Sequence, residues 1–386
     1  MNMEQFDYII AGGGCSGRSL AVRLLPYLKA TNKQVLLVDN IVKKANDKTW
    51  CFWEEKPDLF EPVVCKKWKH LSFSSSFTHQ ESNIYPYQYK MIRSADFYAY
   101  TNEILAQNRH IIMLTGTVEN LYTENELAYA VIDGQKYSSD YTFSSIPQVQ
   151  TKKKERYQYL LQHFLGWIIE TDHAVFDAER ATLMDFKTSQ EAGPSFVYVL
   201  PLTSRRALVE YTVFSEQPLA GRDYIDALKD YIIQHLQCND YTINEQEYGI
   251  IPMSDHPVQS HQGRIIYLGT AGGFTKGSTG YTFRFIQKHT AAIVEQLLKS
   301  GTPYISSVFP KRFRTYDATL LHLLASGRVS GEEIFSTMFQ KNKATQILKF
   351  LDNETTLTEE LHIFKTLNKK EFARALLNRT LKPFRI

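Results

Sequence analysis

The sequence contains little cysteine, and its cysteines form no recognisable site. Only four occur in 386 residues, and no two of them form a C-x-x-C pair. This favours neither a disulfide framework nor a zinc site, and it is typical of a chain kept in a reducing, cytosolic setting. The eleven histidines are scattered without ligand spacing, so we expect no metal site.

Long apolar runs and an excess of one charge are also absent. No stretch of 18 apolar residues exists to span a bilayer, and the first residues lack the pattern of a signal peptide. Lys and Arg total 44 against 41 Asp and Glu, a net charge of +3 that argues against nucleic acid as a partner. We therefore do not expect an integral membrane protein.

Glycine and proline, 19 and 13 residues, are too few for a collagen-like or low-complexity chain. Hydrophobic residues at 43% and charged residues at 22% indicate an ordered chain, whose length suggests two or three domains. The unusual feature is the aromatic content of 13%, from 23 Phe, 23 Tyr and 4 Trp.

A glycine-rich motif follows the first predicted strand, FDYIIA, and opens a predicted helix. The motif consists of Gly12, Gly13, Gly14, Cys15, Ser16 and Gly17. In G-x-G-x-x-G motifs the first glycine permits a tight turn, the second lets the backbone approach a pyrophosphate, and the third lets the helix pack on the strand. The helix N-terminus supplies N–H donors to the phosphates.

An acidic residue completes this dinucleotide-binding pattern. Asp39 ends the second predicted strand, QVLLVD, where an acid is expected to hold a ribose hydroxyl. The location of the motif near the N-terminus favours FAD over NAD, as does a second strand-and-glycine element. That element consists of Gly269, Thr270, Ala271, Gly272 and Gly273. No second G-x-G-x-x-G exists, so we expect a nicotinamide reductant such as NADPH to bind only transiently.

These patterns predict an α/β fold with a Rossmann-like FAD-binding domain, a mixed or antiparallel sheet domain and a helical C-terminal region. We predict an FAD-binding domain with an antiparallel insertion over 1–150 and a substrate-binding, catalytic sheet over 151–260. Residues 261–300 are predicted to return to the first domain. Helical periodicity predicts helices over 301–386, for which membrane contact is one interpretation.

Glu210 stands out among the predicted strands of the second domain. In RALVEYTVF both strand faces are mainly apolar, so this carboxyl lies in an apolar row. Burial there would raise its pKa and keep it protonated near neutral pH, as a general acid requires. The alternatives are an ion pair with Arg205 or Arg206, or an edge-strand position that faces water.

Longer strings occur in the order KTWCFW, HFLGWIIET, LMDF, FVYVLPLTSRRALVEYT, YGIIPM and GTAGGFTKGSTGYTF. Together with DYIIAGGGCSG they resemble the lycopene cyclase family, the FAD-containing carotenoid ring-forming enzymes of bacteria, cyanobacteria and plants. The resemblance covers nearly the whole chain and is greatest to the bacterial lycopene beta-cyclases.

The resemblance implies a redox-neutral isomerisation in which the ends of linear lycopene are protonated and closed into beta-ionone rings. It implies reduced FAD as cofactor, with NADPH or another reductant only maintaining that state. The family's essential acid belongs to a motif that reads Phe-Leu-Glu-Glu-Thr in plant members. Glu210 matches the first acid, whereas Tyr211 replaces the second, which leaves one carboxyl at this place.

A carbocation intermediate would require a dry pocket lined by aromatic faces. The candidates for this lining are Trp50, Phe52, Trp53, Phe274, Tyr281 and Phe283, with ordinary core packing as the alternative for each. Asp185 in LMDF is a candidate supporting carboxylate or proton acceptor, and a structural role is the alternative.

Lycopene is wholly apolar, so we expect peripheral attachment to a membrane in the cytoplasm. A basic amphipathic end is the candidate surface, with packing of this helix on the domain as the alternative. Its cations are Lys365, Lys369, Lys370, Arg374, Arg379, Lys382 and Arg385. The competing functions are an FAD-dependent monooxygenase or polyprenyl reductase that acts on a lipid, and a non-catalytic carotenoid-binding flavoprotein.

Overall fold

The computed structural model describes residues 4–43, 45–147, 157–306 and 308–381, with side chains described up to residue 376. The strands are β1 (Glu4–Ala11), β2 (Val35–Asp39), β3 (Thr49–Glu54), β4 (Val64–Trp68), β5 (His70–Ser74), β6 (His79–Asn83), β7 (Gln88–Arg93), β8 (Ile111–Thr115), β9 (Val118–Glu124), β10 (Leu127–Ile132), β11 (Gln135–Ser144), β12 (Tyr159–Thr171), β13 (Arg180–Asp185), β14 (Ser195–Pro201), β15 (Arg206–Ser215), β16 (Tyr241–Ser254), β17 (His261–Gln262) and β18 (Ile265–Tyr267). The helices are α1 (Cys15–Thr31), α2 (Ser94–Ala106), α3 (Gly221–Gln234), α4 (Phe283–Ser300), α5 (Arg312–Ser326), α6 (Gly331–Lys341), α7 (Ala344–Leu351), α8 (Leu357–Thr366) and α9 (Lys369–Leu381), with short 3-10 turns η1 (Glu61–Val63) and η2 (Gly269–Gly272).

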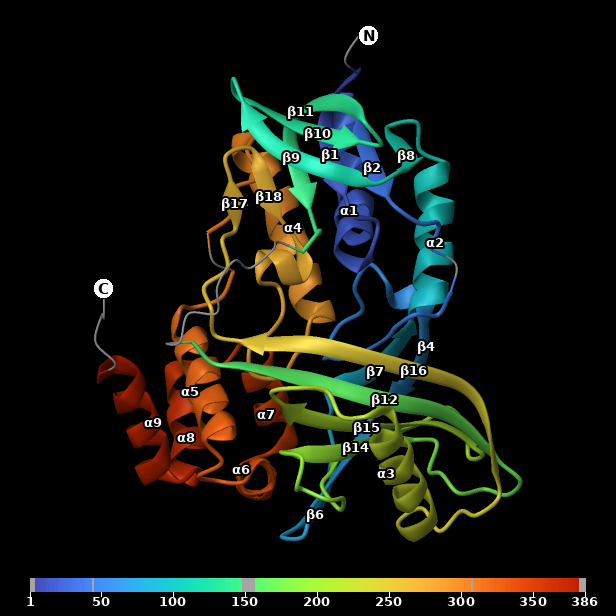
Figure 1. Cartoon of the computed structure of the whole chain (residues 1–386), viewed down its shortest axis with the longest axis vertical. Coiled ribbons are helices and arrows are strands. Elements are labelled where there is room, and N and C mark those ends of the chain that lie inside the picture. Colours follow the sequence, from blue (N-terminus) through green and yellow to red (C-terminus); the bar gives the residue numbers. More distant parts are fainter. Residues whose placement is uncertain (1–3, 44, 148–156, 307, 382–386) are drawn as a thin grey trace.

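The first sheet has the strand order β17-β18-β11-β1-β2-β8 and carries helices on one face and a β-meander on the other (Figure 1). Strands β8, β2, β1, β11 and β18 run parallel. Val35 and Leu37 pack with residues of α1 and α4, while Leu36 and Val38 pack with residues of β10. Burial on both faces explains why this strand is apolar throughout rather than alternating. The predicted α/β fold class is confirmed.

The second sheet has the order β16-β12-β15-β14-β13-β5-β6 and crosses below the first in Figure 1. In β15, Val209 and Val213 pack with α3, whereas Leu208 and Phe214 belong to a core shared with the C-terminal helices. Residues 70–83 supply two strands of this sheet, although we predicted 1–150 as part of the first domain. The reason is that Leu71 and Phe73 of β5 bury their side chains in the same core.

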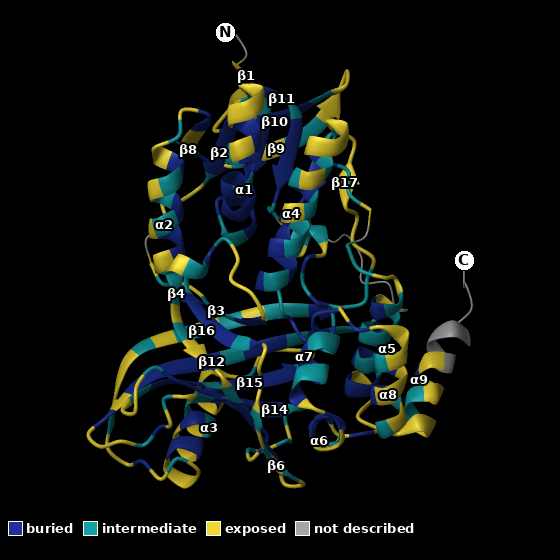
Figure 2. Ribbon diagram, turned by 180° about the vertical axis from the view of Figure 1, so that it is seen from behind, coloured by how far each residue is buried: buried dark blue, intermediate teal, exposed yellow. Residues whose placement is uncertain are grey.

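A third, three-stranded sheet has the order β3-β7-β4. Helices α5 to α9 lie within residues 301–386, where the sequence predicts a helical region, and many of their apolar residues belong to a core shared with the second sheet (Figure 2). Leu367 and Ala375 are buried, and Phe364 and Phe372 pack against the same core, as the alternative of a packed helix predicts. None of the described helices is both long and apolar enough to cross a bilayer.

Candidate active site

The glycine motif forms the tight turn between β1 and α1. Gly12 has a φ of 106°, a value that favours glycine, and a Cβ on Gly17 would lie 2.0 Å from the Gly12 carbonyl oxygen. A Cβ on Gly14 would have no atom of the described residues within 4 Å. The protein therefore leaves no room for a side chain at Gly17 and imposes a glycine conformation at Gly12. At Gly14, where α1 begins, it leaves space for a ligand.

Arg18 holds this turn in place, a role that the sequence analysis missed. Its Nε donates a hydrogen bond to the Gly13 carbonyl at 2.6 Å, and Nη1 donates to Asn102 Oδ1 at 2.6 Å. The side chain is buried, which lowers the pKa of the guanidinium, and the nearby Asp39 partly offsets that effect. An arginine in the first turn of a helix that follows a glycine motif is the signal that could have revealed it.

Asp39 and the second glycine element both lie against the first turn. A Cβ on Gly13 would be 2.8 Å from Asp39 Oδ2, and one on Gly269 would be 2.9 Å from Ser16 Oγ. Gly269 has a φ of 57°. These close approaches build one cradle from the ends of β1, β2 and β18, which is the arrangement that a dinucleotide requires.

A single cavity of about 1120 Å³ connects this cradle with the second sheet. Several predicted site residues line it: Gly14, Ser16, Trp50, Glu210, Gly269, Thr270, Ala271, Tyr281 and Phe283. Its walls also include buried polar atoms that have no partner among the described residues, Thr279 Oγ1 and Gln162 Oε1. The volume exceeds that of a typical pocket for one small ligand, roughly 300–1000 Å³, so a cofactor and a second molecule both have room.

Other predicted site residues support the cavity without lining it. Gly12, Gly13 and Gly17 shape the first turn, against which Asp39 packs, and Gly272 and Gly273 end the second glycine element.

Three of the six predicted aromatic residues are core residues. Phe52 stacks on Phe283 at 4.5 Å between ring centroids, Trp53 donates from Nε1 to the Leu348 carbonyl at 3.1 Å, and Phe274 stacks on His289 at 4.0 Å. All three are at most 5% exposed. These three residues therefore pack in the core, which is the alternative to lining the pocket.

Glu210 projects from β15 into the cavity, on the same face as Leu208 and Thr212. Burial raises the pKa of its carboxyl well above the usual value, Glu247 raises it further, and a hydrogen bond that Thr212 Oγ1 donates at 3.3 Å opposes these effects. The alternative ion pair is absent among the described residues, because Arg206 binds Glu245 at 3.2 Å instead and Arg205 is exposed.

Four neutral groups share the cavity with Glu210, and three of them are phenols. Burial raises the pKa values of Cys51, Tyr89 and Tyr198, and it raises that of Tyr281 to about 12. All four side chains line the cavity. Glu210, whose own pKa is raised, thus shares the cavity with three phenols and a thiol that stay neutral at neutral pH.

Asp185 lies elsewhere. Its Oδ2 accepts a hydrogen bond from the Tyr231 hydroxyl of α3 at 2.8 Å, and its Oδ1 accepts one from the Lys187 N–H at 3.0 Å. The residue does not line the cavity. The proposed catalytic role therefore has no support in the geometry, and Asp185 instead joins the end of β13 to α3.

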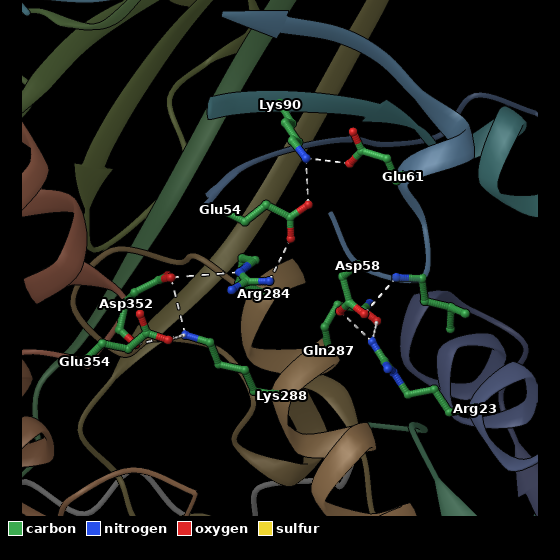
Figure 3. A network of polar contacts seen from close by, with 11 residues as sticks. Arg23, Glu54, Asp58, Glu61, Lys90, Arg284, Gln287, Lys288, Asp352 and Glu354 are labelled. Atoms are coloured by element: carbon green, nitrogen blue, oxygen red, sulfur yellow. Dashed lines mark hydrogen bonds and ion pairs between the residues drawn. The ribbon is translucent and has the colours of Figure 1, made fainter. Parts of the chain in front are cut away.

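A buried ion network fixes the wall that carries Phe283 (Figure 3). Glu54 accepts hydrogen bonds from Lys90 at 2.9 Å and from Arg284 at 2.8 Å. Lys288 pairs with Asp352 at 3.3 Å. Because Arg284 and Lys288 both belong to α4, the network ties this helix to β3, β7 and the C-terminal region.

No group of three potential metal ligands occurs within the described ranges. Among the cations of the predicted membrane surface, Lys365, Lys369, Lys370 and Arg374 are exposed. Lys382 and Arg385 lie outside the described residues, and the side chain of Arg379 is not described.

The chain is similar in sequence to one known protein family over nearly its whole length. The family model described as lycopene cyclase protein matches residues 7–378. A lycopene beta cyclase of Capsicum annuum is 28% identical over 127 residues, which are 30% of this chain and 25% of that protein. A neoxanthin synthase of Solanum tuberosum is 22% identical over 182 residues, 44% of this chain and 34% of that protein. The alignments thus span only a quarter to a third of these curated relatives.

Solved structures share the fold over the whole chain at low identity. A flavoprotein/dehydrogenase from Cytophaga hutchinsonii aligns with a TM-score of 0.63 at 10% identity, covering 97% of this chain and 99% of that one. A geranylgeranyl bacteriochlorophyll reductase-like protein from Thermoplasma acidophilum gives 0.59 at 11%, covering 99% and 98%. A p-nitrophenol 4-monooxygenase from Pseudomonas putida gives 0.59 at 12%, covering 100% of both chains.

Proposed function

Since the chain belongs to the lycopene cyclase family, we propose that it is a lycopene beta-cyclase, an isomerase that closes the ends of lycopene into beta-ionone rings. The products would be gamma-carotene and beta-carotene. The observation that carries this proposal is Glu210, a carboxyl with a raised pKa that lines the same cavity as the dinucleotide cradle. A protonated acid beside aromatic rings suits an apolar substrate that reacts through a cation.

The cradle fits FAD. The open space at Gly14, the N–H groups at the start of α1 and the short η2 turn would hold its phosphates and ribityl chain, with Asp39 on a ribose hydroxyl. Reduced FAD supplies negative charge that stabilises a nearby cation without net electron transfer. We propose NADPH as a transient reductant that maintains this state.

The protein's own groups would act as follows. Glu210 donates its proton to C2 of the terminal double bond, which creates a cation at C1. The C5–C6 double bond attacks that cation through C6, so that the C1–C6 bond forms and the positive charge moves to C5. Transfer of the C6 proton to a base then restores the C5–C6 double bond and completes the beta ring. Proton gain and loss balance, so the product has the mass of the substrate. The rings of Trp50, Tyr198 and Tyr281 stabilise the cation by roughly 0.5–2 kcal/mol each and contribute no nucleophilic anion.

Expression in lycopene-accumulating cells tests the proposal. We expect cyclic carotenes of unchanged mass, identified by chromatography and mass spectrometry, and none from a Glu210→Gln variant that still carries FAD. Unaltered lycopene beside folded, FAD-loaded protein would refute the proposal.

The fold also suits a monooxygenase or a polyprenyl reductase, because proteins with those activities in their descriptions share it. Incubation of the purified protein with lycopene under reducing conditions distinguishes these oxidoreductases from a cyclase. Consumption of NADPH or oxygen in proportion to product favours oxidoreductase chemistry. A non-catalytic flavoprotein would bind lycopene and leave its spectrum unchanged.

We also propose that the protein works in the cytoplasm, attached to a membrane surface that holds the apolar substrate. Exposed Lys365, Lys369, Lys370 and Arg374 support this proposal. Truncation of α9 would remove buried Ala375, so substitution of the four cations by Gln is the better test. Co-sedimentation with anionic liposomes should fall; undiminished binding would refute the role of this surface.

A further inference from the structure

Two carboxyls face each other across one strand of the second sheet. Strands β15, β12 and β16 are neighbours, and Glu210, Gly166 and Glu247 are paired in register across them. Since adjacent strands lie about 4.8 Å apart, the two glutamate backbones are roughly 10 Å apart. Side chains at the same register position project to the same face, and both glutamates line the cavity.

Gly166 leaves the space between them open. A Cβ at this position would lie 3.3 Å from both Cβ and Oε2 of Glu210 and 3.0 Å from Leu208 Cδ1. The Glu210 carboxyl therefore leans over β12, toward the strand that carries Glu247. Any larger residue at 166 would stand between the two acids.

The surroundings of the two acids differ. Oε1 of Glu247 accepts a hydrogen bond from the Thr49 N–H at 2.9 Å, and Lys48 also favours its ionised form, although burial raises its pKa. Within the described ranges, Glu210 has only the Thr212 hydroxyl to favour its ionised form. Glu247 is thus the acid that ionises first, and its charge disfavours a second charge on Glu210.

The other titratable groups near Glu210 and Glu247 do not account for the proposed titration. They are Cys51 of β3, Tyr89 of β7, Tyr198 of β14, Asp47 and Lys48 before β3, and Tyr281 before α4. The thiol and the phenols have pKa values raised above their usual range, so they remain neutral where carboxyls titrate.

We propose that Glu247 is a positioning residue for the acid step, whose carboxylate holds Glu210 in its protonated form across the gap at Gly166. The inference rests on the proposed role of Glu210 as the proton donor. Glu247 supplies a second carboxyl in place of the one that is missing at Tyr211 in the sequence motif. It does so from a strand that begins 30 residues after Tyr211. The pair then carries one proton, on Glu210, and the titrations of the two acids are coupled.

The test compares Glu247→Gln with Glu245→Gln in FAD-loaded protein. Gln at 247 keeps an acceptor for the Thr49 N–H, whereas Glu245, on the same strand, is already paired with Arg93 and Arg206. The infrared C=O band of protonated Glu210, identified by its loss in Glu210→Gln, is followed against pH. We expect the midpoint to fall by about one pH unit or more in Glu247→Gln and to stay in place in Glu245→Gln.

The alkaline limb of ring formation should move by the same amount, while the rate at acidic pH is retained. Glu247→Asp keeps the charge one methylene farther away and should give an intermediate midpoint; it also serves as the test if Glu247→Gln fails to fold. An unmoved midpoint, or an equal fall in Glu245→Gln, would overturn the inference. A shifted midpoint in protein that forms no rings would leave the pair standing and refute the proposed function.

Discussion

Removal of the Glu210 carboxyl should stabilise the protein at neutral pH while it abolishes ring formation. The folded state raises the pKa of this acid above the ordinary value of about 4.3. Below that ordinary value both the folded and the unfolded chain hold the proton, so the group has no effect on the free energy of unfolding. As the pH rises above it, only the unfolded chain releases the proton, and stability falls until the folded pKa is reached.

The slope of this loss is up to about 1.4 kcal/mol per pH unit for one group. Glu210→Gln has nearly the same shape and no proton to release, so its stability lacks this slope. The difference in favour of the variant should therefore grow from about pH 4.5 upward and level off above the folded pKa. Burial of a functional acid is thus a cost in stability that the variant avoids.

Urea unfolding of the two FAD-loaded proteins at half-unit pH steps measures the difference, provided that the m-value stays constant. Glu245→Gln is the control: it removes a carboxylate that binds Arg93 and Arg206, so it should destabilise. Parallel stability curves for wild type and Glu210→Gln across this range would refute the raised pKa, and with it the protonated donor.

Three further predictions concern the walls of the site. Gly166→Ala places a Cβ 3.3 Å from Glu210 and should lower the rate of ring formation roughly tenfold, with FAD content unchanged. The reason is that displacement of a reacting group by one ångström can lower a rate by up to about a hundredfold. An unaltered rate would contradict the need for an open gap. Lys90→Met removes one of the two cations that bind buried Glu54 and leaves Arg284, so it should lower the free energy of unfolding by about 1–3 kcal/mol, measured by urea denaturation. An unchanged free energy of unfolding would contradict this. Gly14→Ala meets no atom of the part of the chain that the structure describes within 4 Å, so unfolding of the apoprotein should be unchanged while the flavin absorbance of the purified protein falls. Full flavin content would contradict an approach of FAD at this turn.

The cofactor cradle could be predicted because its parts are close together in sequence. Gly12, Gly14 and Gly17 lie in one turn, and the shape of that turn follows from the backbone freedom of glycine. The face of Glu210 could be predicted for a similar reason, because alternation along one strand fixes which side chains share a side. The family match over residues 7–378 confirms the resemblance seen in these strings.

The rings were harder to assign, because a buried aromatic residue has the same sequence pattern whether it lines a cavity or fills a core. Trp50 and Trp53 lie on one strand, yet only Trp50 lines the cavity, and Trp53 packs against α7 and its neighbours. Trp53 is a core residue because the C-terminal helices pack against it. The sequence near residue 53 does not show where those distant helices pack.

The sequence by itself determined the glycine turn, the acidic end of β2, the apolar row around Glu210 and the family. Only the tertiary structure decided that Asp185 joins α3 and that Glu247 lies opposite Glu210. The physical reason is strand register: β12 lies between β15 and β16, and it sets Gly166 between two acids that are 37 residues apart in sequence. Periodicity within a strand predicts the face of a side chain, whereas its neighbour across the sheet depends on pairing between distant segments.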